Sequence, residues 1–504
     1  MKSEKWKIES FISSLLILAI AVIPVLAQKN MKIASILQSG TSPVITFRIQ
    51  FLTGSVDDPK GKEGLASLTA SMLAQGGSKN LAYEQIVEKF YPMAAGFGGQ
   101  TDKEMTTFTG QIHKDKLAEY YDLIRQMLLE PGFREDDFKR VKEDAINYLK
   151  VNLRQSNDEE LGKERLYNII YAGTSYEHHS VGTVSSLEKI TLQDVKDFYK
   201  TNYTQANLVI GLSGGFDTKF TAQMQTDFSK LAKGKKAIRK APQTNLTDGM
   251  KIDIVQRETR ATAISLGFPI DVNRASKDYA ALALVASYFG QHRSSNSYLY
   301  GEIREKRGLN YGDYAYIEYF PRGMFQFEPD ANLARMSQIF QIWIRPVEPQ
   351  NANFTLRAAL YEYDKLVKNG IDQKTFEETR DFLIKYVNIL TQTKDAELGY
   401  ALDSRYYGIA NYNQYIKTAL SKLTLADVNA AIKKHLASNK MQIVMITKDA
   451  DGLKKEIAEN KPGMIKYAST KPAEILNEDK IISVYPIPVK AADITITAVD
   501  KVFQ

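Results

Sequence analysis

The chain has 504 residues, no cysteine, and a formal net charge of +7 at pH 7 from 66 lysines and arginines against 59 aspartates and glutamates. This length is too great for one domain and suits two or more. The lack of cysteine excludes disulfide bonds and thiolate metal sites. Basic residues are dispersed among acidic ones, so the charge favours solubility, and we expect no nucleic-acid partner.

The N-terminal segment is typical of an export signal. Three lysines precede an apolar run over residues 11–27, which ends in the small-residue pattern of a cleavage site at Ala27. The run is short for a bilayer span and contains Pro24, which favours cleavage over the alternative of a retained membrane anchor. No cysteine follows it, which excludes a lipid-anchored lipoprotein. We therefore expect a signal peptide over residues 1–27, a periplasmic location, and no membrane insertion after cleavage.

In chain order, the next expected elements are a strand and a helix. Residues 45–51 alternate apolar and polar side chains as a half-buried strand does, and residues 65–74 are helix-prone. Further on, Thr191 is predicted to cap a helix that carries Asp194 in its first turn, near the positive end of the helix dipole. The apolar residues 207–212 that follow are typical of a buried strand.

The same elements recur in the second half of the chain. Residues 263–268 and 277–288 repeat the strand and the helix. Thr424 repeats the helix cap 233 residues after Thr191, and residues 441–446 repeat the strand. An internal repeat with a constant offset predicts two domains that are built alike.

Two further segments complete the predicted organisation. The polar, basic residues that join the halves fit a solvated linker better than a nucleic-acid patch. Near the end of the chain, residues 494–499 alternate as an additional edge strand would. The expected order is a signal peptide, an N-terminal domain, a linker, a C-terminal domain and an extension, over residues 1–27, 28–232, 233–250, 251–455 and 456–504.

The first expected helix resembles a known metal-binding motif in its context but lacks the side chains that would bind the metal. The stretch from Ser67 to Ser71 resembles the zinc-binding helix of the insulinase (pitrilysin-type) peptidases, whose inverted motif is His-x-x-Glu-His. The resemblance places Ser67 and Ser71 where two histidines would bind zinc, Ala70 where a glutamate would activate water, and Asn147 where a third ligand would lie. Serine and alanine perform neither task, so we expect this chain to bind no zinc.

A second motif of the same family is retained. The stretch from Arg307 to Tyr311 resembles the Arg/Tyr motif, which in the family helps to hold the substrate opposite the zinc. The resemblance therefore implies that Arg307 and Tyr311 bind substrate, as donors to a peptide carbonyl or a developing oxyanion. In the alternative interpretation Arg307 ends a helix, Gly308 supplies a left-handed turn, and Tyr311 packs in the core.

Other chemistry has little support in the sequence. No two of the five histidines show the helical spacing of a zinc pair. The adjacent His178 and His179, with Glu177, are better interpreted as a loop pair with satisfied partners than as a weak metal site. No phosphate-binding loop and no serine nucleophile is recognisable.

The resemblance extends over about residues 30–450 and implies fold and function together. It implies an α+β fold with two tandem homologous domains, each a mostly antiparallel sheet with helices packed on one face, that form half of a clam-shell. It further implies a zinc-less subunit of a two-chain zinc peptidase, as in mitochondrial processing peptidase. With the expected export signal, such a peptidase would be periplasmic. A homologous partner with an intact His-x-x-Glu-His motif would hold the zinc and hydrolyse peptide substrates.

Two alternatives remain open. The first is a stand-alone pseudopeptidase that binds peptides, or scaffolds an envelope complex, without hydrolysis. The second is an autonomous peptidase with a rearranged site. The missing zinc residues agree with the first alternative as well as with the two-chain peptidase, and the retained Arg307 and Tyr311 favour the two-chain peptidase.

Overall fold

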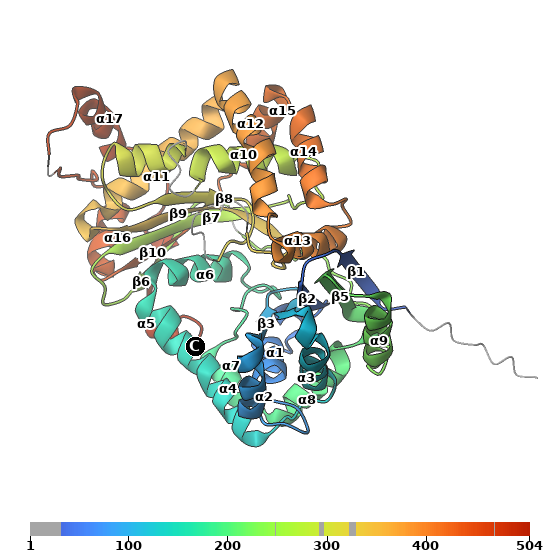
Figure 1. Ribbon diagram of the computed structural model, residues 1–504. Coiled ribbons are helices and arrows are strands. Elements are labelled where there is room, and N and C mark those ends of the chain that lie inside the picture. The colour runs from blue at the N-terminus through green and yellow to red at the C-terminus, as the bar shows by residue number, and fades with distance from the viewer. Residues whose placement is uncertain (1–31, 247, 292–296, 322–328, 468) are drawn as a thin grey trace, which may run out of the picture. The chain divides into compact units, whose positions relative to one another are not determined.

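The structure, a computed structural model, describes residues 32–246, 248–291, 297–321, 329–467 and 469–504. The expected signal peptide therefore lies outside the described residues. Residues 33–504 form one compact unit with two sheets, each accompanied by its own helices (Figure 1). Within the described residues, no helix combines the length and the apolar character that a membrane crossing requires.

The first half of the chain forms a five-stranded sheet in the order β1-β5-β2-β4-β3. Strand β1 pairs with β5 in parallel, and the other neighbours are antiparallel. The strands are β1 (Ala34–Ser39), β2 (Val44–Phe51), β3 (Gly96–Thr101), β4 (Thr106–His113) and β5 (Leu208–Gly214). The helices are α1 (Leu65–Gln75), α2 (Tyr83–Phe90), α3 (Leu117–Leu129), α4 (Glu135–Asn147), the π-helical turn Tyr148–Leu153, α5 (Arg154–Ser156), α6 (Asp158–Ile170), α7 (Val184–Lys189), α8 (Leu192–Asn202) and α9 (Thr218–Phe228).

The second half forms a six-stranded sheet in the order β11-β6-β10-β7-β9-β8. Its strands are β6 (Lys251–Gln256), β7 (Thr262–Ile270), β8 (Asp313–Tyr316), β9 (Gln338–Val347), β10 (Gln442–Thr447) and β11 (Ile494–Ala498). Its helices are α10 (Tyr279–Gly290), the π-helical turn Tyr300–Glu305, α11 (Ala352–Asn369), α12 (Gln373–Leu390), α13 (Lys394–Tyr407), α14 (Tyr412–Lys422), α15 (Leu425–His435), α16 (Ala450–Ala458) and α17 (Ala473–Ser483).

The two halves share one topology, which confirms the predicted repeat. Strands β6, β10, β7, β9 and β8 occupy the places that β1, β5, β2, β4 and β3 occupy in the first sheet. The expected helix caps are also present. The side chain of Thr191 accepts a hydrogen bond from Asp194 N at the start of α8, and Thr424 accepts one from Asp427 N at the start of α15. Strand β11 adds the predicted edge strand, in parallel with β6.

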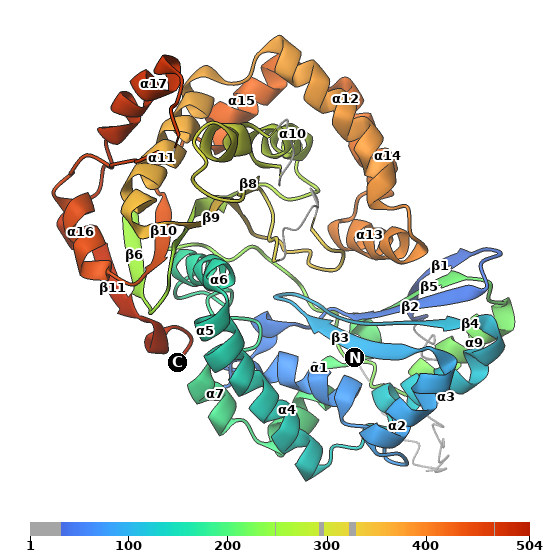
Figure 2. The same ribbon diagram turned by 60° about the vertical axis from the view of Figure 1, so that its left-hand side comes forward.

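One helix from each half packs against the sheet of the other half. Helix α6 lies against β7 and β10 of the second sheet, and α13 lies against β5 of the first. Figures 1 and 2 show α6 on the opposite side of the second sheet from α10 and α11. Gly162 of α6 allows this close approach, because a Cβ atom there would lie 3.0 Å from the Ser265 hydroxyl. The sequence did not predict this exchange of helices.

The exchanged helices explain why the central strands are buried on both faces. In β10, Ile443 and Met445 point into the core of the second half, whereas Val444 and Ile446 join the core that continues through α6 into the first half. Successive side chains of a strand point to opposite faces, so a strand needs two apolar faces when both are covered. The hydrophobic core of the first half therefore includes side chains from both halves.

The C-terminal segment also connects the halves. After β11 in the second sheet, Val502 and Phe503 enter the core of the first half. The backbone there pairs with the start of α7, through Val184 N to Phe503 O at 3.0 Å, and Arg154 Nε donates to Val502 O at 2.7 Å. The extension predicted from residue 456 onward thus packs against both halves.

Candidate functional site

Helix α1, which carries the altered zinc motif, is held firmly at its N-terminus. The carboxylate of Asp58 accepts hydrogen bonds from Gly64 N and Ala66 N, each at 2.7 Å. These amides belong to the first turn, which has no partners within the helix. The helix packs against α4, α8 and β3, as a structural element of this first domain.

The four positions of the altered zinc motif carry none of the side chains that bind zinc in proteins. Ser67 and Ser71 are half-buried on α1, Ala70 is buried, and Asn147 is exposed at the end of α4. Hydroxyl, methyl and amide groups replace two imidazoles and two carboxylates, so the set lacks the nitrogen and carboxylate donors that zinc prefers. The acidic residues beside Asn147, Glu143 and Asp144, are exposed, which agrees with a solvated helix face.

Strand β3 lies beside α1 at the edge of the first sheet (Figure 2). It contains three glycines, and a Cβ atom at Gly96 or Gly98 would meet no atom within 4 Å. Its last residues approach a cavity of about 440 Å³, which is lined by Gln100 of β3, by Arg48 of β2 and by residues of α12 and α13. An exposed strand edge beside a cavity can bind an extended peptide through main-chain hydrogen bonds.

The structure places Arg307 and Tyr311 in very different surroundings. The side chain of Arg307 is fully buried: Nε donates to Asp479 Oδ1 at 2.8 Å, Nη2 to Glu478 Oε2 at 2.7 Å, and Nη1 to the carbonyl of Glu302 at 2.8 Å. Burial by itself lowers the pKa of Arg307. The bonds to Glu478 and Asp479 raise it by more than burial lowers it, so the pKa lies above its usual value. The guanidinium is permanently charged, and each of its three nitrogens donates to a partner.

Tyr311, in contrast, is 72% exposed. Between the two residues, Gly308 adopts a left-handed conformation with φ of +69°, and its amide donates to Arg304 O at 2.7 Å. This geometry ends the helix in the way that the alternative interpretation of the motif requires. That interpretation also placed Tyr311 in the core, where the structure does not have it. The predicted substrate-binding roles of Arg307 and Tyr311 remain predictions.

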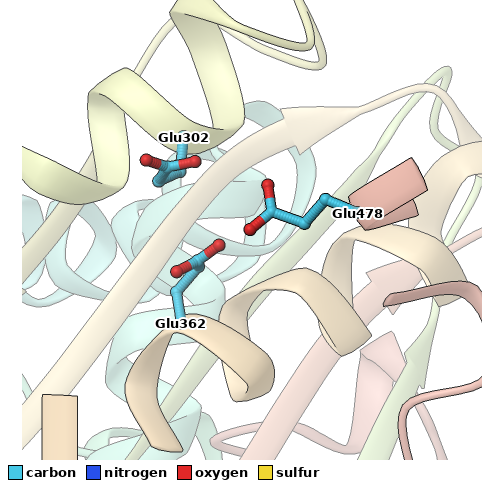
Figure 3. Close-up of side chains that lie close together, drawn as sticks. All are labelled: Glu302, Glu362 and Glu478. Atoms are coloured by element: carbon cyan, nitrogen blue, oxygen red, sulfur yellow. The ribbon is translucent and has the colours of Figure 1, made fainter. Parts of the chain in front are cut away.

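Three carboxylates from three separate elements lie close together (Figure 3). Two of them, those of Glu302 and Glu478, also contact Arg307. Glu302, Glu362 and Glu478 each offer an oxygen atom within 4.8 Å of the others. Oxygen donors of this kind would suit a hard cation such as Mg²⁺ or Ca²⁺ rather than zinc. One oxygen, Oε1 of Glu362, is buried without a hydrogen bond, and burial raises the pKa of this carboxyl.

Cationic side chains already neutralise this cluster. Lys306 lies 2.6 Å from Glu302, and Lys365 lies 2.9 Å from Glu362 and 3.4 Å from Glu478. With Arg307, three cations face these carboxylates, and a metal ion would have to displace them. The cluster is therefore an ion-pair network rather than a metal centre.

The two adjacent histidines have internal partners, as the loop interpretation predicted. Nε2 of His178 lies 3.1 Å from Asp58 Oδ2, next to the start of α1. His179 is buried: its Nδ1 accepts from Val181 N at 3.0 Å, and its Nε2 lies 3.7 Å from Glu164 Oε2. Both residues thus stabilise the structure around α1 and α6.

The sequence did not reveal the residues that pair with Arg307. Glu478 and Asp479 are adjacent acidic residues in the C-terminal extension, and nothing in the sequence around them indicates that they pair with Arg307. Their partner lies 171 and 172 residues earlier in the chain. An acidic pair on a helix is usually solvated, so the available signal was weak.

Comparisons with known proteins agree with this geometry. A family model described as "Insulinase (Peptidase family M16)" matches residues 34–184, and one described as "Peptidase M16 inactive domain" matches residues 189–383. The "Non-peptidase homolog YmxG" of Helicobacter pylori is 21% identical over 401 residues, which cover 78% of this chain and 86% of that protein. An "Uncharacterized zinc protease" of Streptomyces coelicolor is 24% identical over 281 residues, which cover 55% of this chain and 60% of that protein.

The solved structures confirm the fold. The crystal structure of a peptidase M16 inactive domain from Pseudomonas fluorescens superposes with a TM-score of 0.70 and 24% identity, over 82% of this chain and 94% of that one. The expected α+β fold with two similar domains is thereby confirmed. Since the two family models together match most of the chain, the protein belongs to the insulinase family, peptidase family M16.

Proposed function

We propose that this chain is the non-catalytic subunit of a two-chain zinc peptidase, and that a homologous partner supplies the zinc. The observation that carries the proposal is that α1 is intact as a helix but lacks the zinc-binding residues. The helix is capped and packed, yet Ser67, Ala70 and Ser71 stand where the family has its zinc ligands and its general base. A family scaffold without its metal chemistry fits a subunit whose task is binding rather than hydrolysis.

The edge strand of the first sheet, β3, is the surface on which we expect a peptide to bind. Strand β3 presents a glycine-rich edge, where few side chains hinder the approach of another backbone. An extended peptide would add to this edge through main-chain hydrogen bonds, and the neighbouring cavity of about 440 Å³ would receive one of its side chains.

Tyr311 is the residue through which the chain would contribute to the partner's site. Its phenol is exposed and can donate a hydrogen bond to a peptide carbonyl or an oxyanion. Arg307 could take part only after its present partners, Glu478 and Asp479, move away.

A second candidate function is a stand-alone peptide-binding protein. The burial of Arg307 favours it, because a guanidinium held by two carboxylates contributes nothing to a partner's active site in this conformation. The N-terminal apolar segment supports an exported location for either function.

Native co-purification would decide between these functions. The chain, tagged at its C-terminus, would be purified from the periplasmic fraction of its own host, and its companions identified by mass spectrometry. A stoichiometric homologue with His-x-x-Glu-His, about one zinc per pair and peptidase activity are expected. Recovery of the chain alone, without zinc, would overturn the two-chain proposal and support the stand-alone one. Recovery of the precursor in the membrane fraction would contradict signal cleavage.

A further inference from the structure

The segment that covers Arg307 is built as a flap. Hydrogen bonds close its base, where Gly463 N donates to Ser483 O at 2.8 Å and the Ser483 hydroxyl donates to Gly463 O at 2.7 Å. We call residues 463–467 and 469–483, which include α17, the flap. Its two ends meet, so the flap can move as one piece while α16 and β11, on either side of it in the sequence, stay in place.

The base of the flap is anchored on α11. A Cβ atom at Gly463 would lie 2.6 Å from the Cα atom of Phe354, so only glycine permits this contact. Arg357 donates to Lys461 O at 2.8 Å and also bonds Tyr485 O, on the two sides of the base. Movement of the flap would therefore start above this anchor.

Ion pairs hold the rest of the flap, rather than a large apolar face. Of the α17 residues, Asp479 and Ile482 are buried, and Asp479 is shared between Arg307 and the Tyr467 hydroxyl, the latter at 2.6 Å. Buried ion pairs contribute little net stability, because the cost of removing both charges from water offsets their attraction. When the flap lifts, water solvates Arg307 and the two acidic residues again, which limits the cost of opening.

The charges beneath the flap show what could replace it. With the flap closed, Glu302, Glu362, Glu478 and Asp479 face the three cations Lys306, Arg307 and Lys365. Opening removes Glu478 and Asp479, which leaves two carboxylates against three cations. The uncovered surface thus has an excess of positive charge, with Arg307 at its centre. The places that Glu478 and Asp479 had occupied can then be taken by two neighbouring carboxylates of another segment.

We propose that Lys306, Arg307 and Lys365 form a binding site for an acidic peptide segment, which the flap occupies as an intramolecular lid. The proposal rests on the peptide-binding function proposed above and names the class of peptide that this second site takes. A bound segment would place two adjacent acidic side chains where Glu478 and Asp479 now lie. The guanidinium recognises carboxylates through two or more parallel hydrogen bonds, which suits this exchange.

A binding experiment on the full chain tests this proposal without any partner. The probe is a fluorescein-labelled peptide with the sequence of residues 473–483, and its binding is followed by fluorescence anisotropy. The double variant Glu478→Gln/Asp479→Asn should bind the probe about tenfold more tightly than the wild type, because the tethered competitor is weakened. Glu474→Gln, an exposed position on the same helix, is the matched control and should bind as the wild type does.

Two further measurements identify the site. Adding Lys365→Met to the double variant should abolish the gain, and a probe with its acidic residues changed to amides should not bind. Phenylglyoxal should modify Arg307 faster in the double variant than in the wild type, as measured by peptide mass spectrometry. Equal probe binding and equal modification rates in the two proteins would overturn the proposal. Probe binding and phenylglyoxal modification depend neither on zinc nor on hydrolysis. A negative result in these two measurements therefore leaves the two-chain proposal standing. If the two-chain proposal fails, the two measurements can still be interpreted.

Discussion

Arg335 of the second half and Asp102 of the first form a buried, two-point ion pair, with Nε–Oδ2 at 2.7 Å and Nη2–Oδ1 at 2.6 Å. Their side chains are 1% and 3% exposed. The guanidinium also stacks on Tyr319, 3.5 Å from the ring centroid. Burial alone lowers the pKa of Arg335, but the charge and hydrogen bonds of Asp102 raise it by more than burial lowers it, so the guanidinium remains charged.

Removing one partner of this pair should destabilise the whole chain. Asp102→Asn leaves a buried guanidinium without its counter-charge, and we expect a loss of about 3–5 kcal/mol in the free energy of unfolding. Urea denaturation measures this loss. The matched control is Glu159→Gln, whose partner Arg345 is 32% exposed and should cost less than about 1 kcal/mol. Equal losses in the two variants would mean that the buried pair does not connect the halves energetically.

Restoring imidazoles to α1 should restore metal binding. Ser67→His/Ser71→His places two histidines at i and i+4 on one helix face, and Asn147→Glu adds a carboxylate at the position that the family resemblance indicates. The triple variant should bind about one zinc per chain, as measured by metal analysis after dialysis. Ser71→His alone should bind none under the same conditions. A triple variant without zinc would show that α1 and α4 no longer have the geometry of a zinc site.

Tyr311→Phe tests the proposed role of the phenol in the assembled pair. The change removes one hydrogen bond to the substrate or the transition state, and kcat/KM should fall about tenfold. The melting temperature is measured alongside, which separates a loss of stability from a loss of this hydrogen bond. Tyr91→Phe, at an 87% exposed position, serves as the control. Unchanged turnover in Tyr311→Phe would remove this residue from the site.

Phe503 should anchor the C-terminal segment to the first half. The ring is 6% exposed and packs edge-on against His179, with the centroids 5.5 Å apart. Phe503→Ala should lower the free energy of unfolding by about 3–4 kcal/mol, through lost burial and the cavity that remains. Ile238→Ala, at an 82% exposed side chain, should cost less than about 0.5 kcal/mol. Thermal or urea unfolding distinguishes the two variants.

His179 should make the chain less stable in acid. Burial lowers the pKa of His179 from 6.5 to about 4, despite the opposing charge of Glu164. Between these values the unfolded chain binds more protons than the folded one, so this contribution falls as the pH drops from about 6.5 to about 4. Protonation at Nδ1 would also break the bond from Val181 N.

The test compares His179→Gln with the wild type at pH 7 and pH 4.5. The wild type should lose about 2–3 kcal/mol more than the variant over this range. The comparison must be relative, because Glu160 has the opposite effect: burial raises its pKa to about 7, which favours the folded state as the pH falls. Parallel pH profiles of the two proteins would contradict the role assigned to His179.

The sequence by itself determined those helices and strands that depend on residues close together in the chain. The caps at Thr191 and Thr424 and the alternation of β2 depend on residues a few positions apart. The two similar halves could be predicted because these local patterns recur in the same order 233 residues later. Most of the altered zinc motif could also be recognised, because Ser67, Ala70 and Ser71 lie within about one helical turn of α1.

The tertiary structure alone decided how the halves join and what happens to Arg307. The exchange of α6 and α13 depends on which sheet each helix meets, and an apolar helix face does not encode its partner. Arg307 could be recognised in its motif, but its burial depends on Glu478 and Asp479, more than 170 residues away in the chain. Charged side chains at that separation pair only when the packing of the intervening domain brings them together, and local sequence carries no information about that packing.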